Sequence, residues 1–244
     1  MGVRELVLVR HGESEGNLAA AQARIDSAEE IDVPARDADV ELSPLGRRQA
    51  VAAGAAIAAG GAEPAPDLLV CSPYVRARDT ARLACDQAGL DLPTVLDERL
   101  RDRELGVLDR LTFAGVEARY PEEAARRRWQ GKFYHRPAGG ESWADVVLRL
   151  RSWLSDLDRD WPDRRVLVVS HDVVIALVRY VCEGLDEQQV LDLARETPLH
   201  NASVSRLRRG TDGTWTVVAY DDTAHLEAAG LPATEHRGER HARP

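Results

Sequence analysis

The sequence has few cysteines and no long hydrophobic segment. Its three cysteines, Cys71, Cys85 and Cys182, are odd in number and show no CxxC spacing, which excludes a disulfide scaffold and a zinc finger. No apolar run approaches the roughly 18 to 20 residues that cross a bilayer, so a transmembrane protein is excluded. The N-terminal residues show neither a long apolar signal core nor a myristoylation motif. We therefore expect reduced thiols and a cytoplasmic location.

Positive charge is also scarce relative to negative charge. The chain has 32 Lys and Arg residues against 41 Asp and Glu residues, which gives a formal net charge of -9, and Lys132 is the only lysine. An acidic chain repels nucleic acid and anionic membranes, so we expect neither as a partner. The 244 residues are 44% hydrophobic, which is enough for one domain with a sizeable core.

Short apolar runs alternate with helical segments along most of the chain. We predict strands at residues 6–9, 68–71, 94–96 and 166–169, and helices at 18–25, 43–59, 74–88, 121–128, 142–160 and 173–183. Such alternation indicates an α/β fold whose mostly parallel sheet is covered on both faces. Near the end, residues 204–208 and 215–219 flank the turn signal Thr211-Asp212-Gly213, which predicts a hairpin at an antiparallel edge.

No linker or internal repeat divides the chain. We expect a single domain over residues 1–227, with residues 112–140 as an inserted, cap-like region. After about Glu227 the sequence is rich in Gly, Pro, Arg and His and has little apolar content. Residues 228–244 are therefore predicted to form a disordered tail.

Charged and imidazole side chains come directly after the predicted parallel strands. In chain order these residues are Arg10 and His11, then Arg76, then Asp102 and Glu104, and finally His171. Ligands of open parallel sheets bind beyond the carboxyl ends of the strands, so we expect these side chains to meet at one edge. A single histidine after a strand is usually structural, and only the convergence of several such groups indicates a site.

These residue types suit phosphoryl transfer. A phosphate monoester is dianionic and needs bidentate donors, which Arg10 and Arg76 can supply. A neutral imidazole at His11 can attack phosphorus and form a phosphohistidine, while His171 donates to the transferring oxygens. A carboxylic acid would protonate the departing alkoxide and later take a proton from water. No divalent metal is required when arginines spread the charge.

Three motifs, in order, resemble those of the histidine phosphatase superfamily, in its phosphoglycerate mutase-like branch. LVLVRHGESEGN resembles the RHG signature, SPYVRARDTA the second arginine motif and VVSHD the second histidine motif, over about residues 4–220. The resemblance implies a three-layer α/β/α fold, metal-free catalysis without a cofactor and a phosphohistidine intermediate. It also implies roles for particular residues: His11 as nucleophile, Arg10, Arg76 and His171 as phosphate ligands, and Ser14 and Asn17 as pocket residues.

The general acid is predicted at Asp102. Glu104 is the other candidate for this role, and if it is not the acid it is a candidate to contact the substrate. Members of the branch carry an acidic residue four positions before a glycine, which is Gly106 here. Most phosphoglycerate mutases have Glu at that position, so the shorter Asp is a departure. Asp172 replaces the glycine that usually follows the second histidine, and we interpret it as the N-cap of the next helix.

The inserted region and the residues after it supply further candidates for substrate binding. Arg128 and Tyr134 are basic and aromatic and are candidates to contact an acidic substrate, the alternative being a solvated helix face. Glu141 stands in the PAGGES segment, whose counterpart in relatives lies near the pocket. The alternative for that segment is a capping box made by Ser142 and Asp145.

The favoured interpretation is a metal-independent phosphomonoesterase that acts on small phosphorylated metabolites. A cofactor-dependent phosphoglycerate mutase is the alternative, although residues 126–128 only loosely match the paired arginines of the mutase insert. The alternative outside the enzymes is a binding protein: a catalytically weak relative that binds a phosphorylated ligand or protein. Asp102 and Asp172 support this alternative because they depart from the family pattern. The physiological substrate and the oligomeric state stay open; a homodimer is considered because dimers are common in the family.

Overall fold

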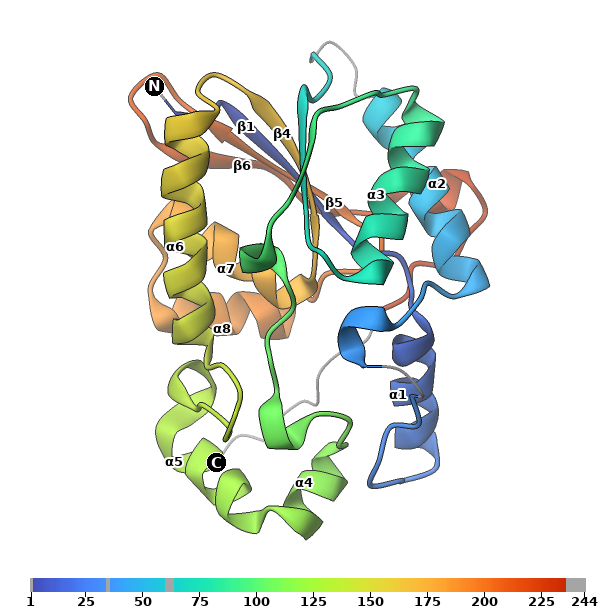
Figure 1. Cartoon of the computed structure of the whole chain (residues 1–244), viewed down its shortest axis with the longest axis vertical. Helices are drawn as coiled ribbons and strands as arrows, with labels where there is room; N and C mark the ends of the chain where they lie inside the picture. Colours follow the sequence, from blue (N-terminus) through green and yellow to red (C-terminus); the bar gives the residue numbers. More distant parts are fainter. Residues whose placement is uncertain (1, 34–35, 60–63, 236–244) are drawn as a thin grey trace.

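A computed structural model describes residues 2–33, 36–59 and 64–235, and a six-stranded sheet forms its centre (Figure 1). The strands are β1 (Glu5–Arg10), β2 (Leu68–Cys71), β3 (Thr94–Leu96), β4 (Arg165–Ser170), β5 (Val204–Arg209) and β6 (Trp215–Asp222). Their order in the sheet is β3-β2-β4-β1-β5-β6. Strands β3, β2, β4 and β1 run parallel, and β5 and β6 are antiparallel. The predicted parallel sheet with an antiparallel edge is confirmed.

Nine α-helices surround the sheet within the described residues. They are α1 (Glu15–Ile25), α2 (Pro44–Ala58), α3 (Val75–Ala88), α4 (Phe113–Arg119), α5 (Pro121–Tyr134), α6 (Trp143–Asp160), α7 (Asp172–Glu183), α8 (Glu187–Glu196) and α9 (Ala224–Ala228). The short helices α4, α8 and α9 were not predicted from the sequence.

Side chains of the central strands alternate between the two faces of the sheet. In β1, Leu6 and Leu8 pack into a cluster with residues of α6 and α7. Val7 and Val9 of the same strand pack into a second cluster with residues of α2 and α3. Successive residues of a strand point to opposite faces, so a strand covered on both sides is apolar throughout. The three layers α/β/α are therefore confirmed (Figure 1).

Capping residues explain where several helices begin. Ser142 and Asp145 form a capping box at the start of α6. This confirms the structural role that was the alternative to substrate binding for the PAGGES segment. The prediction for Asp172 was wrong, because His171 occupies the N-cap and Asp172 is the first residue of α7. The Asp172 carboxylate accepts a hydrogen bond from the N–H of Val173 at 2.8 Å. Its side chain also lines the pocket described below.

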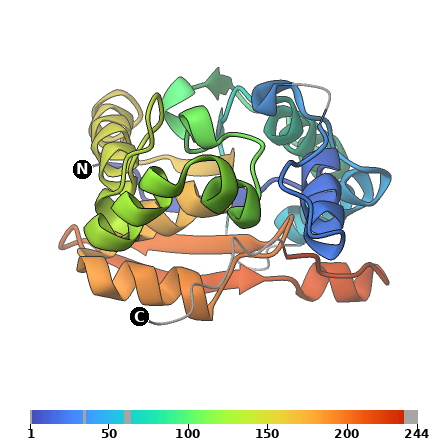
Figure 2. The same cartoon turned by 90° about the horizontal axis from the view of Figure 1, so that it is seen from below.

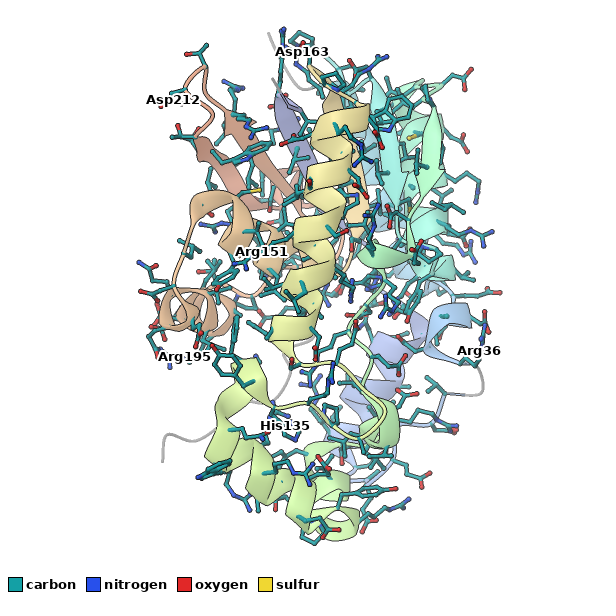
Figure 3. The ribbon with its side chains drawn as sticks, turned by 60° about the vertical axis from the view of Figure 1, so that its left-hand side comes forward. Arg36, His135, Arg151, Asp163, Arg195 and Asp212 are labelled. Carbon is teal, nitrogen blue, oxygen red and sulfur yellow. The ribbon has the colours of Figure 1, made fainter. Side chains whose placement is uncertain are left out.

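Residues 112–140, the insert, hold α4 and α5 beyond the carboxyl ends of the parallel strands (Figures 1 and 2). The insert is tied to the loop after α1 by the ion pair of Arg119 with Glu29, at 2.9 Å. Inside the insert, His135 is buried with a ring nitrogen 3.1 Å from the Glu123 carboxylate (Figure 3). None of the described helices is long and apolar enough to cross a membrane.

The first part of the segment predicted to be disordered packs against the domain. Leu231 donates a hydrogen bond to the carbonyl of Leu226 at 2.9 Å, and Asn201 donates to the carbonyl of Thr234 at 2.8 Å. Residues 228–235 therefore differ from the expectation, because backbone hydrogen bonds tie them to the domain. The rest of the predicted tail, residues 236–244, lies outside the described residues.

Candidate active site

A pocket of about 350 Å³ opens at the carboxyl ends of β1 and β2. The residues predicted from the sequence that line it are Arg10, His11, Ser14, Asn17, Arg76, Asp102 and Glu104. His171 lies directly behind them and is fully buried. The convergence expected from the strand ends is thus present in the structure. None of the residues that line the pocket belongs to the insert.

The ring of His11 has a defined orientation. Its Nδ1 lies 2.7 Å from the carbonyl oxygen of Gly12. A carbonyl oxygen only accepts hydrogen bonds, so Nδ1 carries the proton and Nε2 keeps its lone pair. The Arg76 Nε–H donates to this Nε2 at 3.3 Å. The nitrogen that can act as a nucleophile therefore faces a guanidinium group.

The loop that carries His11 is tightly enclosed. The Gly12 N–H donates to the Thr80 hydroxyl at 3.0 Å, and that hydroxyl donates to the Arg76 carbonyl at 2.7 Å. On the other side, the first turn of α2 approaches so closely that a Cβ at Gly46 would lie 1.9 Å from the Glu13 carbonyl oxygen. The histidine loop and the helix that carries Arg76 are thus held together by one buried hydroxyl.

Arg76 is buried and contacts two carboxylates. Its guanidinium donates to the carbonyl oxygen of Asp37 at 2.5 Å and to the Asp37 carboxylate at 3.1 Å. It also donates to the Asp102 carboxylate at 3.2 Å. Burial opposes its charge, but the two carboxylates outweigh this effect and raise the pKa of Arg76. The result is a permanent positive charge beside His11.

Arg10 supplies a second buried guanidinium, only 3% exposed. One of its terminal nitrogens donates to the carbonyl of Leu199. Its Nε is buried without a hydrogen-bond acceptor among the described residues. An unpaired cationic donor at a pocket wall favours the binding of an anionic oxygen.

His171 is held as a neutral imidazole. Burial, followed by the positive charge of Arg76, lowers its pKa well below the usual value. Its Nε2 lies 2.9 Å from the Ser72 hydroxyl. Its Nδ1 lies 3.4 Å from both the Arg76 guanidinium and the Asp102 carboxylate. The rings of His11 and His171 meet edge to face, with centroids 5.2 Å apart.

Asp102 is the carboxyl group whose surroundings suit acid catalysis. Burial raises its pKa to about 6; Arg76 opposes this rise, whereas Asp172 adds to it. An appreciable fraction of Asp102 therefore carries a proton near neutral pH. Glu104 is exposed, and its carboxylate accepts a hydrogen bond from the N–H of Gly106 at 3.3 Å. The geometry favours Asp102 over Glu104 as the proton donor.

Ser14 and Asn17 line the pocket from the start of α1. The Ser14 hydroxyl accepts from the Asn17 N–H at 3.2 Å, and the Asn17 side chain accepts from the Ser14 N–H at 3.1 Å. This capping box fixes both side chains at the N-terminus of α1, an end that favours negative charge. Asn17 is held further by the amide of Asn201 at 3.3 Å.

Three residues predicted to bind substrate are not brought to the pocket. Arg128 pairs with Glu117 inside the insert, and the Tyr134 hydroxyl donates to Glu187 of α8. Glu141 accepts hydrogen bonds from two arginines and from a backbone N–H, so it braces the chain around Asp102. Each of the three is already engaged by another residue, and none lines the pocket.

Several residues at the site were not predicted from the sequence. Ser72 and Tyr74 stand inside the second arginine motif, and Arg103 follows Asp102 directly, so their positions after strands were a usable signal. Tyr74 packs edge to face on His171, with ring centroids 5.2 Å apart. Asp37 comes from an irregular loop and gave no signal in the sequence. Arg110 also lines the pocket from the segment before the insert.

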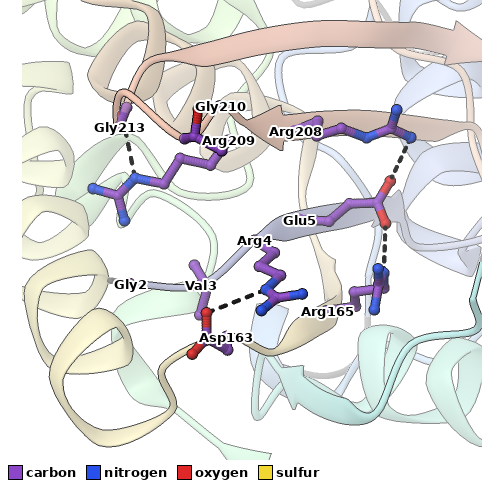
Figure 4. A pocket seen from close by; sticks show the side chains of 11 residues that line it. Gly2, Val3, Arg4, Glu5, Asp163, Arg165, Arg208, Arg209, Gly210 and Gly213 are labelled. Atoms are coloured by element: carbon purple, nitrogen blue, oxygen red, sulfur yellow. Dashed lines mark hydrogen bonds and ion pairs between the residues drawn. The ribbon is translucent and has the colours of Figure 1, made fainter.

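A larger hollow of about 540 Å³ lies at the opposite end of the sheet (Figure 4). Glu5 is buried there between Arg165 and Arg208, with nitrogen to oxygen distances of 3.7 Å and 3.6 Å. Arg4 pairs with Asp163 at 3.1 Å. None of the residues that line this hollow is a histidine, a cysteine or a serine. Each of its four arginines is paired with a carboxylate, so it offers no comparable chemistry.

Comparison with known proteins agrees with this geometry. The chain is 36% identical over 192 residues to a glucosyl-3-phosphoglycerate phosphatase of Mycolicibacterium vanbaalenii, covering 76% of each chain. It is 33% identical over 213 residues to a 2,3-bisphosphoglycerate-dependent phosphoglycerate mutase of a Methylobacterium species, covering 85% of this chain and 93% of the mutase.

Solved structures and a family profile extend the comparison. A mycobacterial glucosyl-3-phosphoglycerate phosphatase in complex with VO3 superposes with a TM-score of 0.71 at 31% identity, covering 90% of this chain and 100% of that one. Residues 6–223 match the profile of the histidine phosphatase superfamily, branch 1. This match spans the strands and helices that build the pocket, and the chain therefore belongs to branch 1 of the histidine phosphatase superfamily.

Proposed function

We propose that this protein is a metal-independent phosphomonoesterase that acts on small phosphorylated metabolites through a phosphohistidine on His11. The observation that carries the proposal is the orientation of the His11 ring. Its Nδ1 is 2.7 Å from a carbonyl oxygen, and its Nε2 accepts a hydrogen bond from Arg76 at 3.3 Å. A lone pair is thereby directed to the place where a guanidinium would hold a phosphate.

In the first step, His11 Nε2 attacks phosphorus and the bond from phosphorus to the ester oxygen breaks. Asp102 gives its proton to the departing alkoxide. Arg10 and Arg76 balance the charge on the phosphoryl oxygens, and His171 donates a hydrogen bond to them. In the second step, water attacks the phosphohistidine, Asp102 takes a proton from that water, and inorganic phosphate leaves with His11 restored.

The proposed substrate carries a second anionic group on the part that leaves. Arg103 and Arg110 line the pocket, and neither forms a salt bridge with a carboxylate of the described residues. Burial and the nearby charge of Arg127 lower the pKa of Arg103 to about 10, so an anion beside it would be stabilising. Glucosyl-3-phosphoglycerate, the compound named for the phosphatase relatives, has such a group in its carboxylate.

Hydrolysis of p-nitrophenyl phosphate in the presence of a chelator tests the proposed reaction. The wild type should release phosphate, and His11→Ala should release none while keeping the thermal midpoint of the wild type. Rapid quenching in base should trap an acid-labile phosphate on the wild type only. Failure of the wild type to hydrolyse this ester and a panel of phosphorylated metabolites would overturn the proposal. Activity with 3-phosphoglycerate only in the presence of 2,3-bisphosphoglycerate would establish a mutase instead.

A further inference from the structure

Two buried amide side chains hold the loop that carries His11. Gln49 of α2 and Asn201, which precedes β5, are both fully buried. The Gln49 side-chain oxygen accepts the N–H of Glu13 at 2.9 Å. The Asn201 side-chain N–H donates to the carbonyl oxygen of His11 at 3.1 Å. The two amides thus fix the peptide groups on either side of Gly12, whose carbonyl orients the His11 ring.

Thr234, beyond the last helix, connects these two amides. Its hydroxyl accepts from the Gln49 side-chain N–H at 3.0 Å and donates to the Asn201 side-chain oxygen at 3.2 Å. The Gln49 N–H also donates to the carbonyl of Pro232 at 3.0 Å. The backbone of Thr234 accepts from the Asn201 N–H at 2.8 Å. Residues 231–235, which we name the strap, therefore engage both amides at once.

The strap and the histidine loop select the same orientation of each amide. An amide has one accepting end and one donating end, and neighbouring groups select between its two orientations. The carbonyl of Pro232 can only accept, so the Gln49 nitrogen turns to the strap and its oxygen turns to Glu13. The Thr234 hydroxyl accepts a hydrogen bond from the Gln49 side-chain N–H and donates one to the Asn201 side-chain oxygen. The Asn201 nitrogen is consequently directed at His11.

We propose that the strap positions the nucleophile and that Thr234 is a positioning residue for phosphoryl transfer. The inference rests on the proposed function, because it takes His11 as the nucleophile. Thr234 touches neither the pocket nor the phosphate ligands, so its influence passes through Gln49 and Asn201 to the loop. Small displacements of a reacting group reduce rates strongly, by up to about 100-fold for an error near 1 Å.

The strap contributes little to the hydrophobic core, which separates positioning from stability. Pro232 and Ala233 are exposed, and Leu231 packs only at the edge of the cluster beneath α2 and α3. Thr234→Val removes the two hydrogen bonds of the hydroxyl, and each neutral hydrogen bond contributes about 1 kcal/mol of stability. The Thr234→Val protein should therefore stay folded while the two amides lose their shared partner.

The test compares Thr234→Val, Thr234→Ser and a matched control, Thr216→Val. Thr216 is exposed on β6, and its hydroxyl donates to the carbonyl of Arg208 at 3.3 Å. With p-nitrophenyl phosphate well below the thermal midpoint of each variant, Thr234→Val should lower kcat by roughly 10-fold. KM should stay within about twofold of the wild type, because Arg10 and Arg76 are unchanged. Thr234→Ser should restore kcat, and the control should match the wild type.

Three results would overturn the inference: an unchanged kcat in Thr234→Val, a kcat that Thr234→Ser fails to restore, or an effect confined to KM. If Thr234→Val unfolds, Asn201→Leu replaces it, since this change removes the donor to His11 with a side chain of similar size. An unchanged kcat in Asn201→Leu would likewise overturn the inference. His11→Ala separates the two proposals: an active His11→Ala refutes the proposed function, whereas an inactive His11→Ala with a normal Thr234→Val refutes only the strap.

Discussion

Arg76 donates to both the carbonyl oxygen and the carboxylate of Asp37, at 2.5 Å and 3.1 Å. A carboxylate thus occupies part of the guanidinium that is proposed to bind phosphate. The Arg76 side chain is 4% exposed whereas that of Asp37 is 47% exposed, so the aspartate is the partner that can move aside. Asp37 therefore competes with the phosphoryl group for the same cation.

Replacement of Asp37 by Asn should strengthen phosphate binding. Asn keeps an oxygen that can accept from Arg76 but removes a negative charge that repels the substrate. We expect the inhibition constant of inorganic phosphate to fall by about 3- to 10-fold, which corresponds to roughly 1 kcal/mol. Asp39→Asn is the control, because Asp39 pairs with Arg36 at the surface. Weaker phosphate binding in Asp37→Asn would show that its charge positions Arg76 instead.

The role of Asp102 predicts a specific pH dependence. Its acid form is the proton donor, and this form is lost as the pH rises through a pKa of about 6. Above that pH, kcat/KM for an alkyl phosphate should fall relative to kcat/KM for p-nitrophenyl phosphate, whose leaving group needs no proton. The second ionisation of the phosphate falls at a lower pH for p-nitrophenyl phosphate than for an alkyl phosphate, so each ester is titrated alone and its ionisation is divided out of the ratio. A ratio that stays constant between pH 5 and 8 would contradict the assignment.

Amide variants distinguish the two acidic candidates. Asp102→Asn should lower kcat for an alkyl phosphate by about 100- to 10,000-fold, the usual contribution of a positioned acid. With p-nitrophenyl phosphate, Asp102→Asn should slow the formation of the phosphohistidine much less, because this leaving group needs no proton. Glu104→Gln should leave both activities near the wild type, because Glu104 is exposed and bonded to a backbone N–H. The reverse pattern would place the acid at Glu104.

Arg103 should matter only for substrates with a second anion. Arg103→Met should raise KM for a phosphoglycerate-type ester by about 10- to 100-fold, the value of a lost charged hydrogen bond of 1.5–3 kcal/mol. The kcat/KM for p-nitrophenyl phosphate should change by less than about threefold, since that ester carries no second anion. Arg4→Met is the control, because Arg4 lies in the hollow at the far end of the sheet. Equal losses for both esters would contradict a separate anion subsite.

Close packing at Gly46 predicts a loss of stability. A Cβ there would meet the Glu13 carbonyl oxygen at 1.9 Å, and both groups belong to the backbone. Gly46→Ala should lower the free energy of unfolding by about 1–3 kcal/mol, as overpacking does. Gly16→Ala is the control, since its Cβ would meet side chains and no backbone atom, the nearest being Val40 at 3.3 Å. Thermal unfolding of the two variants should show a marked drop for Gly46→Ala alone.

The sequence by itself determined the family, the order of strands and helices and the convergence at the strand ends. Apolar runs such as residues 6–9 and 166–169 indicate strands buried on both faces, and parallel strands bring the residues after them to one edge. Arg10, His11, Arg76, Asp102 and His171 therefore lie together in the structure. These inferences succeed because they depend on local patterns and on a topology that the patterns imply.

Only the tertiary structure decided the partners of these groups. Asp37 reaches Arg76 across 39 positions of sequence, and Asn201 reaches His11 across 190. Arg128, Tyr134 and Glu141 resembled substrate contacts, yet each is held by another residue, as Tyr134 is by Glu187 of α8. The pKa of Asp102 likewise depends on burial and on charges brought from three other segments. A contact between distant segments requires the packed fold, because residue type and spacing record which groups are available but not which neighbour each one meets.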